Sequence, residues 1–221
     1  MSGRGIRVAL VDDQPLFRGG LRMLIDSQDD LEVVGEAGDG VEARSMVRTS
    51  KPDVVLMDIR MPRADGIQAT EWIVADAAGA EGPRILVLTT FDLDENAARA
   101  IRAGASGFVL KDAEPEFLLA AIRTVHSGTA VLAPAATTEL FQHFGERGPV
   151  PGDPDVLLHD LSAREREIFQ LAARGLSNSE IAKAEFVSEA TVKTHISRVL
   201  AKLGLRDRVQ LVVYAFENRL V

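Results

Sequence analysis

The chain contains four short apolar runs rich in Val, Ile and Leu, separated by longer amphipathic stretches. Continuous apolar runs of this kind are typical of strands buried on both faces of a parallel sheet. A further strand is expected at 32–37, where EVVGEA precedes a Gly-rich turn. The sequence therefore predicts an α/β fold built on a parallel sheet. The four runs are IRVALVDD (6–13), DVVLMD (53–58), RILVLT (84–89) and GFVLK (107–111).

Polar residues able to do chemistry stand at or just past the end of each run. An Asp pair after a single strand usually forms only a turn, but such residues at four strand ends together favour a site. The carboxyl ends of parallel strands share one edge, where open α/β sheets bind their ligands. We therefore expect these side chains to converge there. They are Asp12, Asp13, Asp58, Thr89 and Lys111.

Three neighbouring carboxylates repel one another and are stable together only if they share a cation. Their oxygen ligands make Mg²⁺ the natural candidate. With the charge offset, one carboxylate can attack a phosphoryl group and form an acyl phosphate, and Asp58 is the expected nucleophile. The metal and Lys111 then neutralise the transferring group, while the Thr89 hydroxyl donates a hydrogen bond to the product.

The motifs around these residues resemble those of response-regulator receiver domains over residues 5 to about 128. The resemblance implies a doubly wound (βα)5 fold and a coupled switch pair, Thr89 and Phe108. It also implies a Mg²⁺ site formed by Asp13, Asp58 and the Arg60 backbone carbonyl, with Asp12 acting mostly through water. The matching motifs are VDD (11–13), MDIRMP (57–62), DG (65–66), LTTF (88–91) and GFVLKD (107–112).

Composition limits the alternatives. The 221 residues suggest one or two domains, and 46% apolar residues can form ordinary cores. The chain has no cysteine and hence no disulfide framework. No apolar stretch approaches the roughly 18 residues of a transmembrane helix, and the N-terminus does not read as a signal peptide. A cytoplasmic protein without a membrane partner is expected.

Charge is distributed unevenly along the chain. Residues 1–128 carry 14 Lys and Arg against 21 Asp and Glu, whereas residues 161–221 carry 10 against 7. Between them, AATTELFQHF (135–144) predicts a connecting helix, and the Pro- and Gly-rich ERGPVPGDPD (146–155) predicts a linker without regular structure. The expected organisation is a receiver domain at 1–128, a connecting helix and linker at 129–159, and a second, more basic domain at 160–221.

The C-terminal 61 residues predict four short helices. Two capping-box patterns mark helix starts, Ser162 with Glu165 and Ser177 with Glu180, and Ser188 is a third candidate N-cap. Gly175 and Gly204 stand where helices would end. The short interval FVS (186–188) then predicts the turn of a helix-turn-helix.

The helix that starts at Ser188 is amphipathic. An apolar stripe of Val192, Ile196, Val199 and Leu203 is expected to face the core. Hydroxyls and cations on the other face suit contact with phosphates and base edges in a major groove. The candidate DNA contacts on and beside this face are Thr191, Lys193, Thr194, His195, Arg198 and Lys202.

A second resemblance covers residues 160–221. LSAREREIFQLAARGLSNSEIA followed by VSEATVKTHISRVLAKLGLRDRVQLV resembles the LuxR-type helix-turn-helix of NarL/FixJ regulators. It implies Lys193, His195, Arg198 and Lys202 as the main DNA contacts, and a last helix at 206–217 as a dimerisation surface. Glu185 departs from the family pattern, which has a buried Leu or Met at this position, and this leaves the local stability of the scaffold helix in question.

The two resemblances together predict a transcription factor controlled by phosphorylation. A sensor histidine kinase would phosphorylate Asp58, Thr89 would move toward the phosphoryl group, and Phe108 would repack. The altered receiver face would then release or dimerise the DNA-binding domain. The expected partners are the kinase, double-stranded DNA with an inverted-repeat operator, and a second copy of the chain. The only chemistry expected is the receiver's own phosphoryl transfer and a slow dephosphorylation.

Two other classes of protein remain as alternatives. A Mg²⁺-dependent phosphohydrolase would also use Asp58 as nucleophile, but it needs a second acid/base carboxylate close by, and DIRMP supplies none two residues further on. A ligand-sensing LuxR-type regulator needs an enclosed apolar pocket, whereas the polar strand ends favour a charged, open site.

Overall fold

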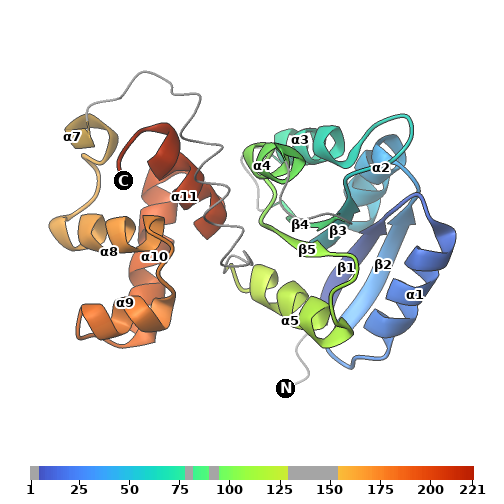
Figure 1. The fold of residues 1–221 in the computed structure, drawn as a ribbon, viewed down its shortest axis with the longest axis horizontal. Helices are drawn as coiled ribbons and strands as arrows, with labels where there is room; N and C mark the ends of the chain where they lie inside the picture. The colour runs from blue at the N-terminus through green and yellow to red at the C-terminus, as the bar shows by residue number, and fades with distance from the viewer. Residues whose placement is uncertain (1–4, 78–81, 90–94, 129–153) are drawn as a thin grey trace. The chain divides into compact units, whose positions relative to one another are not determined.

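The computed structural model describes residues 5–77, 82–89, 95–128 and 154–221. The predicted connecting helix at 135–144 lies outside these residues, as does most of the predicted linker. The chain divides into two compact units, Met1–Leu132 and Ala133–Val221. Figure 1 shows the first as a sheet covered by helices and the second as a group of helices.

The first unit has the expected α/β fold. Five parallel strands form one sheet in the order β2-β1-β3-β4-β5. The strands are β1 (Ile6–Val11), β2 (Leu31–Ala37), β3 (Val54–Asp58), β4 (Arg84–Thr89) and β5 (Gly107–Leu110). The helices between and after them are α1 (Pro15–Asp26), α2 (Gly40–Ser50), α3 (Gly66–Asp76), α4 (Glu95–Arg102) and α5 (Pro115–His126).

Apolar side chains on both faces of the sheet hold this unit together. On one face, Val8, Leu10 and Leu56 pack against α1 and α5 through residues such as Ile25 and Ile122, all buried. The neighbouring strand residues alternate to the opposite face, because successive side chains of a strand point to opposite sides. The sequence lacks the polar alternation of a half-exposed sheet because both faces are covered.

The first strand ends at Val11, and Asp12 and Asp13 lie in the turn just past its end, as expected. The Asp12 carboxylate accepts a hydrogen bond from the Gln14 backbone N–H at 2.8 Å, and Pro15 begins α1. This turn leaves both carboxylates just beyond the edge of the sheet.

The described residues of the second unit, 154–221, form the four expected helices after one short helix. They are α7 (Pro154–Leu157), α8 (Ala163–Ala173), α9 (Asn178–Ala184), α10 (Glu189–Leu203) and α11 (Arg208–Glu217). Both predicted capping boxes are present, Ser188 caps α10, and Gly204 ends it with a positive φ of 66°. The linker was predicted to run to residue 155, which is wrong, because α7 already begins at Pro154. Pro is favoured in the first turn of a helix.

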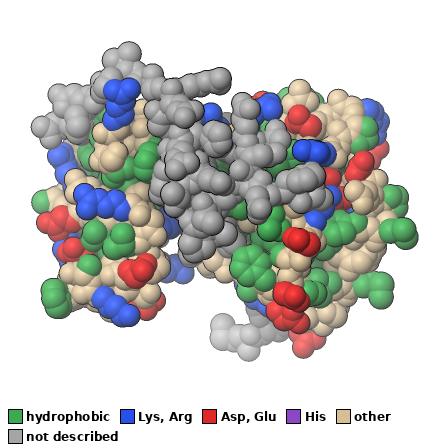
Figure 2. Space-filling view, in the orientation of Figure 1, with side chains coloured by type: hydrophobic (Ala, Val, Ile, Leu, Met, Phe, Trp, Pro, Cys, Tyr) green, Lys and Arg blue, Asp and Glu red, His purple; other side chains and the backbone are tan. Residues whose placement is uncertain are grey.

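Side chains of α8 to α11 enclose the core of the second unit, with Ile168, Phe169 and Ile181 fully buried. The short α7 joins this core: the Tyr214 hydroxyl of α11 donates to the Leu157 carbonyl at 3.3 Å. In Figure 2 the visible face of this unit carries Lys and Arg side chains interspersed with Asp and Glu. None of the described helices is long and apolar enough to span a membrane.

Candidate functional site

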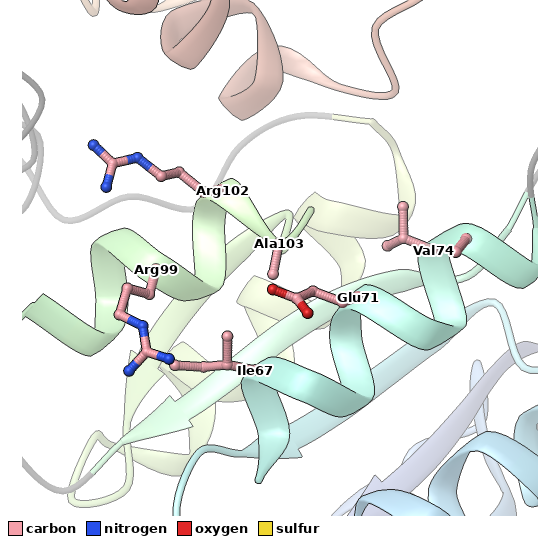
Figure 3. A pocket seen from close by; sticks show the side chains of 7 residues that line it. Ile67, Glu71, Val74, Arg99, Arg102 and Ala103 are labelled. Carbon is pink, nitrogen blue, oxygen red and sulfur yellow. The ribbon is translucent and has the colours of Figure 1, made fainter. Parts of the chain in front are cut away.

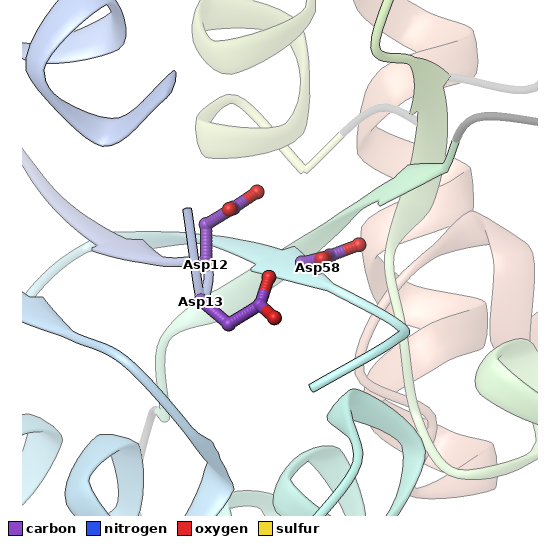
Figure 4. A group of neighbouring side chains, drawn as sticks. All are labelled: Asp12, Asp13 and Asp58. Carbon is purple, nitrogen blue, oxygen red and sulfur yellow. The ribbon is translucent and has the colours of Figure 1, made fainter. Parts of the chain in front are cut away.

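Three carboxylates meet at the carboxyl edge of the sheet. Asp12 and Asp13 follow β1, and Asp58 ends the adjacent β3, where Val11 pairs with Met57. One ligand oxygen from each carboxylate lies within 4.8 Å of the others (Figure 4). Asp12 and Asp58 are 1% and 5% exposed, whereas Asp13 is open to solvent. The neighbouring strands thus bring together residues that are 45 positions apart in sequence.

Lys111 supplies the positive charge within this cluster. Its ammonium lies 2.6 Å from a carboxylate oxygen of Asp12 and 2.9 Å from one of Asp58, and its side chain is 9% exposed. Burial alone would lower the pKa of Lys111, but hydrogen bonds and charges from the two aspartates outweigh it and raise this pKa. Lys111 is therefore a permanent cation, and it offsets one of the three negative charges.

Burial also affects the expected nucleophile. It raises the pKa of Asp58, the charge of Asp12 adds to that effect, and Lys111 opposes it. The carboxylate is therefore poorly solvated and strongly attracted to any further cation. A second positive group beside Lys111 would stabilise the ionised form that nucleophilic attack requires.

Thr89 and Phe108 lie on the next two strands. Asp58 pairs with Leu88, so Thr89 stands one residue further along β4, and its carbonyl accepts a hydrogen bond from the Lys111 N–H at 2.7 Å. Phe108 in β5 is 6% exposed. Thr89 and Lys111 thus stand at the same edge as the acidic cluster, and Phe108 is buried in the adjacent strand.

Two side chains at the start of α1 reach the site, and the sequence patterns did not indicate either. The Phe17 ring lies 4.9 Å from the Lys111 ammonium, a cation–π contact. The Arg18 guanidinium donates to the Asp12 backbone carbonyl and pairs with Glu36. The only available signal was that a helix starting directly after the Asp pair must place its first turn beside that pair.

Gly66 packs directly against the phosphoacceptor candidate. A Cβ at this position would lie 2.0 Å from the Asp58 carbonyl oxygen, and the Gly66 N–H donates to the Ile59 carbonyl at 2.9 Å. Asp65 caps α3 by accepting from the Gln68 N–H. The DG motif therefore returns the chain to the end of β3 with no room for a side chain.

In the second unit, α10 has the predicted amphipathic arrangement. Val192, Ile196 and Val199 are buried, and Leu203 is half-buried. Within the described part of the chain, the exposed Lys193 and Arg198 make no hydrogen bond or ion pair through their side chains. Their cationic groups are therefore available to an external anion.

The other candidate DNA contacts have different surroundings. The Thr191 hydroxyl lies 2.9 Å from that of Ser188, and the Thr194 hydroxyl donates to the Ala190 carbonyl at 2.9 Å. His195 is half-buried, and its Nδ1 has no hydrogen-bond partner in the described residues. Lys202 is bound to Glu165 at 2.7 Å. On the basic face of α10, Lys193 and Arg198 are thus exposed, whereas Lys202 is paired with Glu165 of α8.

Glu185, the departure from the family pattern, is held by an arginine. It caps the end of α9, and its carboxylate and its carbonyl both accept hydrogen bonds from Arg164 of α8. Its side chain is 23% exposed, so the position is more open than a buried Leu would be. This ion pair joins α8 to the end of α9.

These two sites define a phosphoryl-accepting receiver followed by a helix-turn-helix. Residues 8–123 match the family model for the response regulator receiver domain, and residues 159–215 match that for bacterial regulatory proteins of the luxR family. The chain belongs to the NarL/FixJ-type response regulators. It is a transcription factor that is phosphorylated on an aspartate by a sensor histidine kinase and binds DNA through its C-terminal helix-turn-helix.

Similar proteins cover nearly the whole chain. The uncharacterized transcriptional regulatory protein YxjL of Bacillus subtilis is 43% identical over 98% of this chain and 97% of its own length. The oxygen regulatory protein NreC of Staphylococcus carnosus is 38% identical over 98% and 99%. The crystal structure of ChrA, a response regulator of a heme-sensing two-component system, is 41% identical with a TM-score of 0.51, covering 98% of this chain and 99% of that one.

The ion pair between Glu165 and Lys202 should make the stability of the second unit depend on pH. Hydrogen bonds from Lys202 and from the Ser162 backbone lower the pKa of Glu165 from 4.5 to about 2. A depressed folded-state pKa contributes stability that is complete above 4.5 and lost as the pH falls toward about 2. We expect the unfolding temperature of Glu165→Gln to be lower at neutral pH and to fall less on acidification.

The matched control is Glu180→Gln, which alters the other capping box, where no lysine bridges to another helix within the described residues. Thermal unfolding of the full chain, followed by circular dichroism across this pH range, measures both variants. If Glu165→Gln and the wild type lost stability in parallel on acidification, the ion pair would not be the source of this dependence.

Proposed function

We propose that Asp58 is the residue phosphorylated and that the edge of the sheet around it performs the transfer. The observation that carries this proposal is the cluster of three carboxylates with Lys111 bound to two of them. The Asp58 oxygen attacks the phosphorus of the donor, the bond to the kinase histidine breaks, and an acyl phosphate forms. Lys111 neutralises charge on the transferred group, and the Thr89 hydroxyl donates a hydrogen bond to it.

The residues at this edge fit a Mg²⁺ ion. Their oxygens are the hard ligands that Mg²⁺ prefers, and Lys111 leaves the cluster with excess negative charge. We propose that Asp13, Asp58 and the Arg60 carbonyl hold the ion, with Asp12 acting through water. A bound ion would supply charge neutralisation for the phosphoryl oxygens. Asp13 is the exposed carboxylate of the three, so an ion would enter the site from the side on which Asp13 lies.

The signal is proposed to leave the site through Thr89 and Phe108. Thr89 would move toward the phosphoryl group and Phe108 would repack, which would alter the face of the receiver near β4 and β5. The phosphorylated chain would then dimerise, with α11 as the contact between DNA-binding domains, and bind an inverted repeat. The domain limits proposed for this coupling are 1–128 for the receiver, 129–159 for the connecting helix and linker, and 160–221 for the DNA-binding domain.

The protein is proposed to act in the cytoplasm, where its DNA target lies.

A small-molecule sensor is the alternative that the receiver unit supports less well. A pocket of about 390 Å³ lies between α3 and α4 (Figure 3). It is open to solvent and three of its seven lining side chains are charged, whereas a ligand sensor needs an enclosed pocket that buries most of its ligand. This pocket therefore gives no support to ligand sensing. Its lining residues are Ile67, Glu71, Val74, Ala75, Arg99, Arg102 and Ala103.

The phosphoacceptor assignment predicts a single phosphoryl adduct. Incubation with acetyl phosphate and Mg²⁺ should add one phosphoryl group in the intact mass, because among the described residues only Asp58 combines a strand-end carboxylate with two acidic neighbours. The adduct should be absent without Mg²⁺ and in Asp58→Ala. Asp26→Ala, which alters an exposed carboxylate at the end of α1, is the control and should retain it. An adduct that persists in Asp58→Ala would exclude Asp58 as the acceptor.

If α10 is the recognition helix, the helix that contacts the DNA, binding to DNA should weaken as the salt concentration rises. Neutralising Lys193 or Arg198 should reduce the slope of log affinity against log salt by about one unit for each phosphate that the protein no longer neutralises. Lys202→Met should change the slope less, because its ammonium is bound to Glu165. Fluorescence anisotropy on an inverted-repeat duplex at several salt concentrations measures the slopes. Slopes that do not respond to Lys193 or Arg198 would show that another surface binds the DNA.

The phosphorylated state should be long-lived. Hydrolysis needs a water held opposite the Asp58 oxygen, and the residues two beyond Asp58 and two beyond Thr89 should overhang that approach. They are Arg60, which cannot accept a proton, and Phe91, which lies outside the described residues and offers no hydrogen bond. The double substitution of Arg60→Asn with Phe91→Glu should supply a water-positioning pair and shorten the lifetime, as measured by the decay of the adduct. Decay within seconds in the wild type would contradict this account.

A further inference from the structure

The loop between β3 and α3, residues 59–65, contains one strained backbone position. Arg63 has a φ of 65°, in the left-handed region that side chains other than Gly and Asn seldom adopt. Such a conformation persists only where the surrounding contacts fix it. The same loop carries the Arg60 carbonyl, which is one of the proposed Mg²⁺ ligands.

The Arg63 side chain binds the start of α2. Its guanidinium pairs with Asp39 and lies 2.7 Å from a carboxylate oxygen of Glu42. Asp39 is 1% exposed, and its other oxygen accepts from the backbone N–H groups of Val41 and Glu42 at 2.8 and 3.0 Å. Arg63 therefore meets a carboxylate that the backbone of α2 already holds in place.

Ion pairs on an exposed surface contribute little because water solvates both partners. The carboxylate of Asp39 has left water, and a buried charge without a counter-charge is costly. Arg63 supplies that counter-charge, with Glu42 as its second partner. The Arg63 side chain is itself 61% exposed, so of its two partners it is the buried Asp39 that ties its conformation to the start of α2.

The backbone of the loop is fixed beside this ion pair. The Gly40 N–H donates to the Ala64 carbonyl at 3.1 Å, and a Cβ on Gly40 would lie 2.9 Å from that oxygen. At the other end of the loop, Gly66 contacts the Asp58 carbonyl. The segment between Asp58 and Gly66 is thus held at both ends, and Arg63 is the side chain that anchors it to α2.

We propose that Arg63 is a positioning residue of the metal site: by binding Asp39 and Glu42 it fixes the loop that carries the Arg60 carbonyl and thereby sets the affinity for Mg²⁺. This inference rests on the proposed Mg²⁺ site. The start of α2 contributes no metal ligand, but by this proposal it controls the geometry of the loop 59–65.

The test measures Mg²⁺ affinity separately from stability. The full chain is unfolded thermally in a series of Mg²⁺ concentrations, and the rise in unfolding temperature gives the dissociation constant by linkage. Two variants remove the ion pairs: Arg63→Ala keeps the backbone strain, and Arg63→Gly relieves it. Both should bind Mg²⁺ about tenfold more weakly, the lower limit of the effects seen for partners behind metal ligands. Arg63→Lys keeps the charge and should lie between them and the wild type.

Arg44→Ala is the matched control. Arg44 joins α2 to α3 through a two-point ion pair with Asp76 at 2.7 Å and does not contact the loop. Its removal should lower the unfolding temperature without Mg²⁺ while leaving the Mg²⁺ dissociation constant unchanged. If Arg63→Ala fails to fold, Arg63→Lys and Glu42→Gln carry the same comparison, and both should weaken Mg²⁺ binding.

The outcomes separate the two proposals. A wild type whose stability does not respond to Mg²⁺, or responds equally in Asp13→Asn, would overturn the metal site and this inference with it. A wild type that responds, together with an unchanged dissociation constant in the folded Arg63 variants, would overturn the role of Arg63 alone. Equal weakening in Arg44→Ala would overturn it too, because removing any ion pair on α2 would then have this effect.

Discussion

The site of the first unit depends on how the repulsion among three carboxylates at one edge of the sheet is offset. Asp12, Asp13 and Asp58 can stand within 4.8 Å of one another only because Lys111, at the end of β5, places its ammonium between two of them. The apolar core supplies the rigidity that such an arrangement requires, since it is buried on both faces of the sheet. The remaining negative charge is what makes the edge receptive to a metal ion and then to a phosphoryl group.

The sequence was sufficient to predict the strands, the helix caps and the polar residues at the strand ends, because each follows from a local pattern. The capping boxes at Ser162 and Ser177 depend on residues three positions apart. The contacts of Phe17, Arg18 and Arg63 could not be predicted in this way. Their partners lie on other elements, and a long side chain gives no periodic signal that would indicate which neighbour it reaches.

The basic face of α10 shows the same limit. In the sequence, Lys202 is equivalent to Lys193 and Arg198, and Glu165 is a capping residue of a different helix. In the structure, one Glu165 oxygen accepts from both the Ser162 N–H and Lys202, so a single carboxylate begins α8 and fastens it to α10. The charge on this face is therefore divided between holding the recognition helix in place and meeting an external anion, and charge counting cannot separate the two roles.

At two of the positions that depart from a local rule, an arginine compensates. Glu185 occupies a site where the family has an apolar residue, and Arg164 of the preceding helix binds it. Arg63 adopts a left-handed conformation, and its own guanidinium binds Asp39 and Glu42. Local exceptions that persist with such compensation often mark functional positions. Glu185 lies in the scaffold of the DNA-binding unit, and Arg63 lies in the loop beside the phosphoacceptor. The two departures therefore concern the positioning of functional elements rather than the packing of the hydrophobic cores.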